Sequence, residues 1–216
     1  MIWRMLFPAL LKTGPAYREV VAIRDSLVNF YVVKGTAGLV CIDSGWRPGH
    51  IISAFGELGL SVRDVVAVFL THSHWDHARG LAAFPNAEVF VGEQEGPHLS
   101  PRFSIQSRKL ERVRDGQELE RGGITVRVVS TPGHTPGAVS YLVGGRLLFT
   151  GDTLRLRHGE ILPFLAWFNH DGQAQIGSIR KLAGIEQLEC VLTGHTGLTV
   201  TPAKAFQRWR GQEARS

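Results

Sequence analysis

Cysteine is scarce in this sequence, which holds only Cys41 and Cys190 in 216 residues. Each lies inside an apolar run that is typical of a buried strand, so we expect two buried thiols rather than a disulfide framework. No apolar run approaches the roughly 18 residues of a membrane-spanning helix. Residues 1–11 include Arg4 and Pro8 and lack the basic leader, apolar core and cleavage site of a signal peptide. We therefore expect a cytoplasmic protein with no membrane segment.

Excess charge of one sign is also small. The chain has 24 Lys and Arg against 19 Asp and Glu, a formal net charge of +5. The basic residues 102, 108, 109, 112 and 114 gather in one segment, but Glu111 and Asp115 interrupt them or follow them. A solvated basic face explains this run more simply than a nucleic-acid site, although a nucleic acid or an anionic substrate stays open. The partner that we expect is a small-molecule substrate.

Composition otherwise matches an ordinary globular protein, with 44% hydrophobic and 20% charged residues. A chain of this length buries one substantial core, and we find no internal repeat or linker. We therefore expect one domain over residues 1–216. The 25 glycines favour a loop-rich α/β design.

The most concentrated chemistry lies in residues 71–77, Thr-His-Ser-His-Trp-Asp-His. This stretch directly follows the apolar run 65–70, which predicts a buried strand, so the motif is expected on a loop at the strand's end. A packed core has no use for three imidazoles and a carboxylate this close together, because every polar atom would need a partner. Neutral imidazole is the commonest zinc ligand in proteins. The stretch predicts a metal site.

Three later strand ends carry the same kinds of side chain. His134 lies in the Pro- and Gly-rich segment 130–137, Asp152 follows the run 147–149, and His195 follows the run 190–192. Earlier in the chain, Asp43 also ends a strand-like run, and we expect it to support the site by hydrogen bonding rather than to bind a metal. Placing functional groups at the ends of several strands is how α/β scaffolds build sites.

The remaining pattern alternates strands with helices, as in a layered α/β fold. We predict strands over residues 19–23, 28–33, 38–42, 65–70, 87–91, 124–129, 139–143, 147–149 and 190–192, and helices over 48–58, 78–84, 171–182 and 202–209. Residues 96–116 and 155–170 show no clear period, and we expect them to form walls of the site. Pro163, Trp167 and Phe168 are candidate pocket residues, whereas Ser73 is expected to be a small spacer and Trp75 to pack under the metal loop.

The ordered motifs THSHWDH, TPGHTPG, TGD and GHTG resemble those of the metallo-β-lactamase-fold superfamily, and the resemblance covers nearly the whole chain. It implies an α/β (α+β) fold in four αββα layers, with the metals at one edge of the sheets. It also implies that His72, His74 and His134 bind a first ion and that Asp76, His77 and His195 bind a second. Asp152 would bridge the two ions together with a water or hydroxide.

Within this superfamily the sequence is similar to the compact glyoxalase II-like metallo-hydrolases. This implies two divalent ions, with Zn²⁺ favoured and Fe or Mn as alternatives, and a metal-bridged hydroxide that attacks a small ester, thioester or lactone. Asp76 is expected to be the catalytic residue that orients this hydroxide or passes a proton to the leaving group. Little chain follows His195, so the helical domain that binds glutathione in glyoxalase II is not expected here.

Other functions stay open on the same motifs. A mononuclear iron oxidoreductase resembling persulfide dioxygenase would use only the first set of ligands. A phosphodiesterase or nuclease resembling tRNase Z would suit the basic charge, although the chain lacks room for that family's extra arm. A catalytically dead binding scaffold is disfavoured because such copies usually lose ligands, and this sequence keeps all seven.

Overall fold

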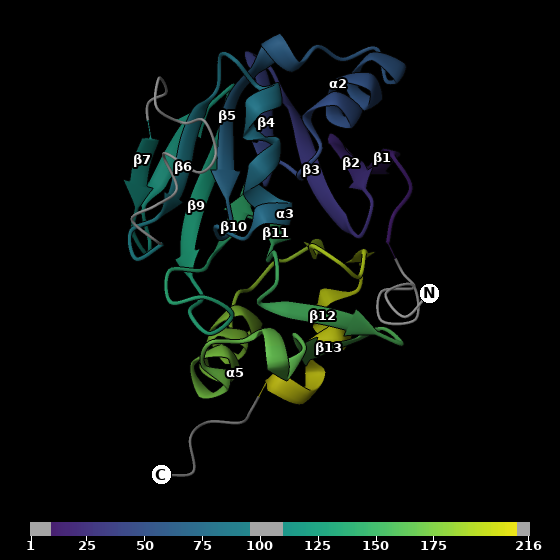
Figure 1. Ribbon diagram of the computed structural model, residues 1–216. Coiled ribbons are helices and arrows are strands. Elements are labelled where there is room, and N and C mark those ends of the chain that lie inside the picture. Colours follow the sequence, from purple (N-terminus) through teal and green to yellow (C-terminus); the bar gives the residue numbers. More distant parts are fainter. Residues whose placement is uncertain (1–9, 96–109, 211–216) are drawn as a thin grey trace.

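The structure is a computed structural model that describes residues 10–95 and 110–210. In this part of the chain two large sheets pack face to face, and a small hairpin lies beyond one end of them (Figure 1). The first sheet has the strand order β1-β2-β3-β4-β5-β6-β7, the second has the order β15-β14-β11-β10-β9-β8, and the hairpin pairs β12 with β13.

The bounds of the elements are as follows. The first sheet contains β1 (Gly14–Tyr17), β2 (Val20–Asp25), β3 (Val28–Gly35), β4 (Gly38–Ile42), β5 (Val65–Leu70), β6 (Glu88–Gly92) and β7 (Leu110–Val113). The second contains β8 (Glu118–Arg121), β9 (Ile124–Ser130), β10 (Val139–Val143), β11 (Leu147–Phe149), β14 (Cys190–Leu192) and β15 (Leu198–Thr199), and the hairpin contains β12 (Leu154–Arg157) and β13 (Glu160–Pro163). The α-helices are α2 (Pro48–Glu57), α3 (Trp75–Ala78), α5 (Gly172–Ala183) and α6 (Pro202–Ala205), and the 3₁₀ helices are η1 (Val62–Asp64), η2 (Arg79–Ala83), η3 (Ala166–Phe168) and η4 (Gln207–Trp209).

Three apolar cores separate four layers, which confirms the expected αββα sandwich. One core joins α2 and η2 to the first sheet, a second lies between the sheets, and a third joins the second sheet to α5 and α6. Strand β5 contributes to two of these cores, because Val68 and Leu70 face the helices while Ala67 and Phe69 face the other sheet. Successive side chains of a strand point to opposite faces, so a strand covered on both sides is a continuous apolar run.

Parallel pairing brings the predicted strand ends to one edge. Strands β4 and β5 are parallel neighbours, with Ile42 opposite Phe69, so residues 43 and 71 emerge together. In the second sheet β11 and β14 are parallel, with Phe149 opposite Leu192, so the segments 150–152 and 193–195 also emerge together. Figure 1 shows the hairpin β12–β13 and helix α5 below this edge.

Two buried tyrosines tie the ends of the sheets together. Tyr31 of the first sheet donates its hydroxyl to the Thr193 carbonyl oxygen at 2.7 Å, and Tyr141 of the second donates to the Leu70 carbonyl oxygen at 2.8 Å. Burial raises the pKa of both hydroxyls, so each stays protonated and able to donate. These bonds fix the starts of two loops that carry candidate metal ligands.

Most predicted elements are present, with several corrections. Residues 75–77, predicted as loop, begin the short helix α3, and the helix predicted over 78–84 is the 3₁₀ helix η2. The segment 155–170, predicted as irregular, contains the β12–β13 hairpin and η3, because its Arg157–Glu160 turn pairs two short strands. Of the segment 96–116, residues 96–109 lie outside the described part, while residues 110–113 form strand β7. The final helix is interrupted after Ala205 and continues as η4.

The expectation of two buried thiols is confirmed. Cys41 and Cys190 are buried and free. Asp171 caps α5, because its carboxylate accepts hydrogen bonds from the backbone N–H groups of Gln173 and Ala174 at 2.9 and 3.0 Å. In the described residues, no helix combines the length and hydrophobicity that a bilayer crossing requires.

Candidate metal centre

Asp43 supports the loop that follows β5 through its side-chain carboxylate. Its carboxylate accepts a hydrogen bond from the Thr71 N–H at 2.7 Å and lies 2.8 Å from Nδ1 of His77. Asp43 adopts a left-handed backbone conformation, with φ of 62°, which Asp tolerates better than most residues. The expected supporting role of Asp43 is therefore confirmed.

A first group of donors consists of His72, His74 and His134. Each offers one ring nitrogen, and these atoms all lie within 4.8 Å of one another. Nδ1 of His74 and Nε2 of His134 are 2.9 Å apart, although they come from segments 60 residues apart in the sequence. Three imidazoles that face one point are a donor set suited to Zn²⁺ or a similar transition-metal ion.

A second group consists of Asp76, His77 and His195, whose donor atoms also lie within 4.8 Å of one another. Nε2 of His195 is 3.4 Å from Nε2 of His77 and 3.4 Å from Oδ2 of Asp76. His77 is fully buried, while the Asp76 side chain is 18% exposed and reaches the solvent-accessible cavity. One carboxylate and two imidazoles form a second suitable donor set.

Asp152 lies between the two groups. Its Oδ2 is 3.2 Å from Nε2 of His195 and 3.6 Å from Nε2 of His134, and its Oδ1 is 3.5 Å from Nε2 of His77. The carboxylate therefore faces histidines of both groups. The structure brings together all seven residues that the sequence singled out.

The outer ring nitrogens are oriented by oxygen atoms. Nδ1 of His72 faces Thr71 Oγ1 at 3.1 Å, Nδ1 of His134 faces Asn169 Oδ1 at 3.2 Å, and Nδ1 of His195 faces the Leu27 carbonyl oxygen at 2.6 Å. Such contacts fix the tautomer of each ring and aim Nε2 at the centre. Asn169 and Leu27 were not singled out in the sequence, because neither residue type carries a signal for this role.

Among the described residues, two buried side-chain atoms at this centre have no hydrogen-bond partner. They are Nε2 of His72 and Oδ1 of Asp152, and both belong to the converging donor groups. Buried polar atoms are nearly always paired, so an unpaired nitrogen and an unpaired carboxylate oxygen at one centre need an explanation. A bound cation supplies it, because both atoms have lone pairs to donate. The residues present therefore fit divalent metal ions.

Charges within the centre are strongly coupled. Burial lowers the pKa of His72 well below its usual value, so this imidazole is neutral. Burial also opposes charge on His195, but the Asp152 and Asp76 carboxylates outweigh it and raise its pKa to about 9. Conversely, burial raises the pKa of Asp152, yet His195 and His77 hold it well below the usual range. The centre thus keeps an ionised carboxylate among imidazoles.

Glycine is required beside these ligands. A Cβ atom on Gly194 would lie 2.6 Å from Oδ1 of Asp152 and 2.8 Å from Cε1 of His77. A Cβ on Gly133 would lie 2.5 Å from Gln175 atoms of α5, and its φ of +141° is one that side chains rarely adopt. Gly194 of GHTG therefore permits close approach of the backbone to the ligands, and Gly133 of TPGHTPG permits close approach of the His134 loop to α5.

Glu95 joins two ligand-bearing loops and was not singled out in the sequence. It is buried, and its carboxylate accepts hydrogen bonds from the Ser73 N–H at 2.9 Å, from the Ser73 hydroxyl and from the Thr135 hydroxyl. Ser73 is therefore more than the expected spacer, since it ties the loop of His72 and His74 to Glu95. One feature of the sequence could have pointed to Glu95: it lies shortly after the end of a strand, as the candidate ligands do.

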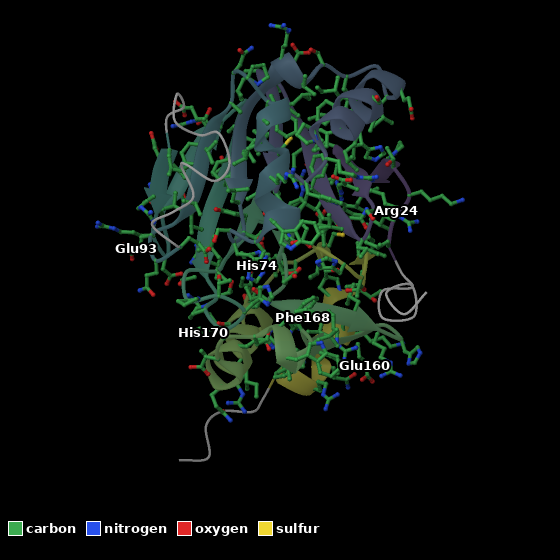
Figure 2. All side chains as sticks on the ribbon, viewed as in Figure 1. Arg24, His74, Glu93, Glu160, Phe168 and His170 are labelled. Atoms are coloured by element: carbon green, nitrogen blue, oxygen red, sulfur yellow. The ribbon has the colours of Figure 1, made fainter. Side chains whose placement is uncertain are left out.

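A cavity of about 610 Å³ opens onto the centre. Its lining includes His74, Asp76, His134, Asp152 and His195, together with residues 25–28 and four aromatic side chains, which are Trp46, Trp75, Phe164 and Phe168. Figure 2 shows His74 and Phe168 in the middle of the molecule, between the large sheets and the β12–β13 hairpin. Volumes of this size suit small-molecule ligands.

The aromatic residues bring two corrections. Trp75 does not pack under the metal loop: it is 52% exposed and lies edge-on to Trp46, with ring centroids 4.9 Å apart. Of the three predicted pocket residues only Phe168 lines the cavity, while Trp167 is 74% exposed and Pro163 pairs with Leu154 in the hairpin. Neighbouring Phe164, which the sequence did not single out, lines it instead, because the η3 turn redirects the chain.

The sequence is similar to those of known proteins. Over 118 residues the chain is 33% identical to the probable polyketide biosynthesis zinc-dependent hydrolase BaeB of Bacillus velezensis, covering 53% of this chain and 49% of that protein. Over 161 residues it is 30% identical to hydroxyacylglutathione hydrolase of Ruegeria pomeroyi, covering 68% of this chain and 57% of that protein. The chain thus spans about half the length of these curated relatives.

Solved structures agree on the fold. A metallo-beta-lactamase family protein from Thermus thermophilus superimposes with a TM-score of 0.66 at 25% identity, over 89% of this chain and 77% of that one. BJP-1, a subclass B3 metallo-beta-lactamase of Bradyrhizobium japonicum, gives a TM-score of 0.68 at 22% identity, over 99% and 87%. The family model described as metallo-beta-lactamase superfamily matches residues 23–195, and the chain belongs to this superfamily.

Proposed function

We propose that this protein is a metallo-hydrolase that holds two divalent ions, zinc by preference, and cleaves a small ester, thioester or lactone. The observation that carries the proposal is the pair of donor groups linked by Asp152, in which Nε2 of His72 and Oδ1 of Asp152 are buried and unpaired within the described part of the chain. Names of relatives support the same class, since they include a zinc-dependent hydrolase and a hydroxyacylglutathione hydrolase.

The ligands divide between the two ions as the donor groups do. His72, His74 and His134 would hold the first ion, and Asp76, His77 and His195 would hold the second. Asp152 contributes to both, because its two oxygens face imidazoles of both groups. The imidazole-rich composition suits zinc better than magnesium or calcium, which prefer oxygen ligands.

Two such ions, when bound, supply Lewis-acid activation of a water and of the substrate carbonyl. The chain's own groups then handle the proton. Asp76 is suited to this task, since its carboxylate reaches the cavity and lies 3.4 Å from Nε2 of His195. Although burial opposes ionisation, His77 and His195 keep the pKa of Asp76 below its usual value. Asp76 therefore stays ionised and orients the attacking water or carries its proton to the leaving group.

Elemental analysis tests the proposal most directly. We expect the protein, purified without added metal, to contain close to two zinc ions per chain and to hydrolyse at least one member of a panel of thioesters, lactones and esters. About one iron per chain with little zinc would overturn the proposal in favour of an oxygenase, to be checked by oxygen consumption with persulfides. Cleavage of phosphodiesters alone would move the assignment to a nuclease.

Glu95→Gln tests the link between the two loops. The substitution keeps the shape but replaces an acceptor oxygen with an NH₂ donor beside the N–H or hydroxyl groups that Glu95 now accepts from. We expect zinc affinity of the first donor group to fall about tenfold, because contacts behind ligands typically matter by that factor. Competition with a chromogenic chelator measures the affinity.

Glu93→Gln is the matched control. Glu93 lies two residues away on the same turn, but its carboxylate pairs with Arg114 at the surface, at 3.0 Å. The Glu93→Gln substitution should leave the affinities of both donor groups for zinc unchanged. Equal affinities for Glu95→Gln and Glu93→Gln would show that Glu95 does not position the ligands.

A further inference from the structure

An aromatic path leads from the metal centre to the surface. The Phe164 ring lies against two candidate ligands, with centroids 5.3 Å from His134 and 5.5 Å from His195. Phe168 continues the path, its ring centroid 6.1 Å from that of Phe164, and it is 38% exposed. The path therefore begins against two candidate ligands and extends outward for two rings.

Two tryptophans add a second aromatic pair to the cavity. Trp46 and Trp75 pack edge to face, and both line the cavity. Trp75 is half exposed even though it adjoins Asp76 in the sequence. Exposure of so large an apolar side chain beside a site marks a surface that binds something apolar.

Cationic side chains are missing from the described lining of this cavity. Among residues 10–95 and 110–210, those that line it include no lysine or arginine. Arg47 lies beside the cavity, with its guanidinium carbon 5.5 Å from the ring centroid of Trp46, but its charge is matched by the buried Asp25 carboxylate, which pairs with its Nε at 2.5 Å. Asp25 is itself occupied, because it also accepts hydrogen bonds from the N–H groups of Trp46 and Arg47 at 2.8 Å. The described walls thus offer no counter-ion to a substrate carboxylate away from the metal ligands.

From these observations we infer that the substrate is an uncharged ester or thioester whose apolar chain or ring lies along Phe164 and Phe168. The inference rests on the proposed hydrolase function and specifies its substrate class. Against the walls formed by residues 10–95 and 110–210, carboxylate-bearing carriers such as glutathione are disfavoured, because their charges would be desolvated beside aromatic rings with no unmatched cation in that part of the lining. Phe168 is the specificity-determining residue that the inference singles out, since it lies at the outer end of the path.

Matched thioesters test both parts of the inference. N-acetylcysteamine thioesters with acetyl and hexanoyl groups differ only in chain length, and hexanoyl glutathione differs from the second only in its charged carrier. Burial of a methylene contributes about fourfold in binding, so four partly buried methylenes should give about 50-fold in kcat/KM for hexanoyl over acetyl. The uncharged hexanoyl thioester should exceed its glutathione counterpart by at least about tenfold.

Phe168→Ala should reduce the ratio of hexanoyl to acetyl kcat/KM by about five- to tenfold, because it removes one ring of the path. Ile52→Ala is the matched control. Ile52 is also an exposed large apolar residue, at 50%, but it lies on α2 and does not line the cavity. For Ile52→Ala the ratio of hexanoyl to acetyl kcat/KM should equal that of the unsubstituted protein.

The outcomes separate this inference from the proposed function. Equal kcat/KM for the acetyl and hexanoyl thioesters, or a preference for the glutathione thioester, would overturn the inference. Either result would leave the proposed hydrolase function intact. If no thioester is cleaved, calorimetric titration of the zinc-loaded protein with hexanoate and acetate decides. Tighter binding of hexanoate that Phe168→Ala weakens would support the apolar path, and equal or absent binding of the two acids would overturn the inference. The hydrolase itself would fail only if the esters and lactones of the panel were also left uncleaved.

Discussion

Asp76→Ala is expected to lower kcat/KM by about 10³- to 10⁴-fold on any substrate that the protein cleaves. Positioned proton transfer contributes about 10² to 10⁴ in rate, and this substitution also removes a donor from the second metal group. A 10³-fold loss corresponds to about 4 kcal/mol of transition-state stabilisation. Steady-state kinetics, with zinc content measured on the same sample, gives the result.

Two further variants sharpen this test. Asp76→Asn keeps an oxygen donor but loses the basic carboxylate, so zinc content should fall less than in Asp76→Ala while kcat stays low. Asp64→Ala removes an exposed carboxylate of η1, away from the centre, and should change neither quantity. If Asp76→Ala retained most of the activity at full zinc content, the role assigned to Asp76 would be wrong.

His134→Ala is expected to lower the zinc content from about two ions per chain to about one. The substitution removes Nε2, which lies 2.9 Å from Nδ1 of His74 and 3.6 Å from Oδ2 of Asp152. Loss of one of three imidazoles leaves the first ion with too few protein ligands, whereas the second group is intact. Elemental analysis after gel filtration measures the stoichiometry, and activity should fall with it.

The neighbouring Asn169 provides a graded comparison. Its Oδ1 orients Nδ1 of His134, so Asn169→Ala should weaken the first zinc by about tenfold without removing it. His50→Ala, on the exposed face of α2, should leave both ions in place. An unchanged stoichiometry of two zinc ions in His134→Ala would take His134 out of the ligand set.

Proximity in sequence explains how much of the site could be predicted. His72, His74, Asp76 and His77 lie within one short segment, and each later candidate follows an apolar run whose strand character is plain. Because parallel strands present their carboxyl ends at one edge, strand ends with metal-binding side chains were expected to meet. Even Asp43 could be assigned a supporting role from its place at a strand end.

Glu95 and the aromatic walls could not be predicted in the same way. Glu95 acts through contacts with Ser73 and Thr135, residues 22 and 40 positions away, and its place after a strand end does not reveal these partners. Phe164 lies just before η3 and Trp75 is the first residue of α3, and the direction of such short helices depends on what they pack against. Propensity does not decide which face of a one-turn helix meets solvent.

By itself, the sequence determined the strand and helix alternation, the choice of seven candidate donors and membership of the family's fold class. Local rules suffice there, because a buried strand must be apolar and a metal site must supply imidazole or carboxylate. Only the tertiary structure decided which oxygens orient those side chains and which aromatic residues face the cavity. These features depend on the register of β4 with β5 and of β11 with β14, and register is set by packing between the sheets.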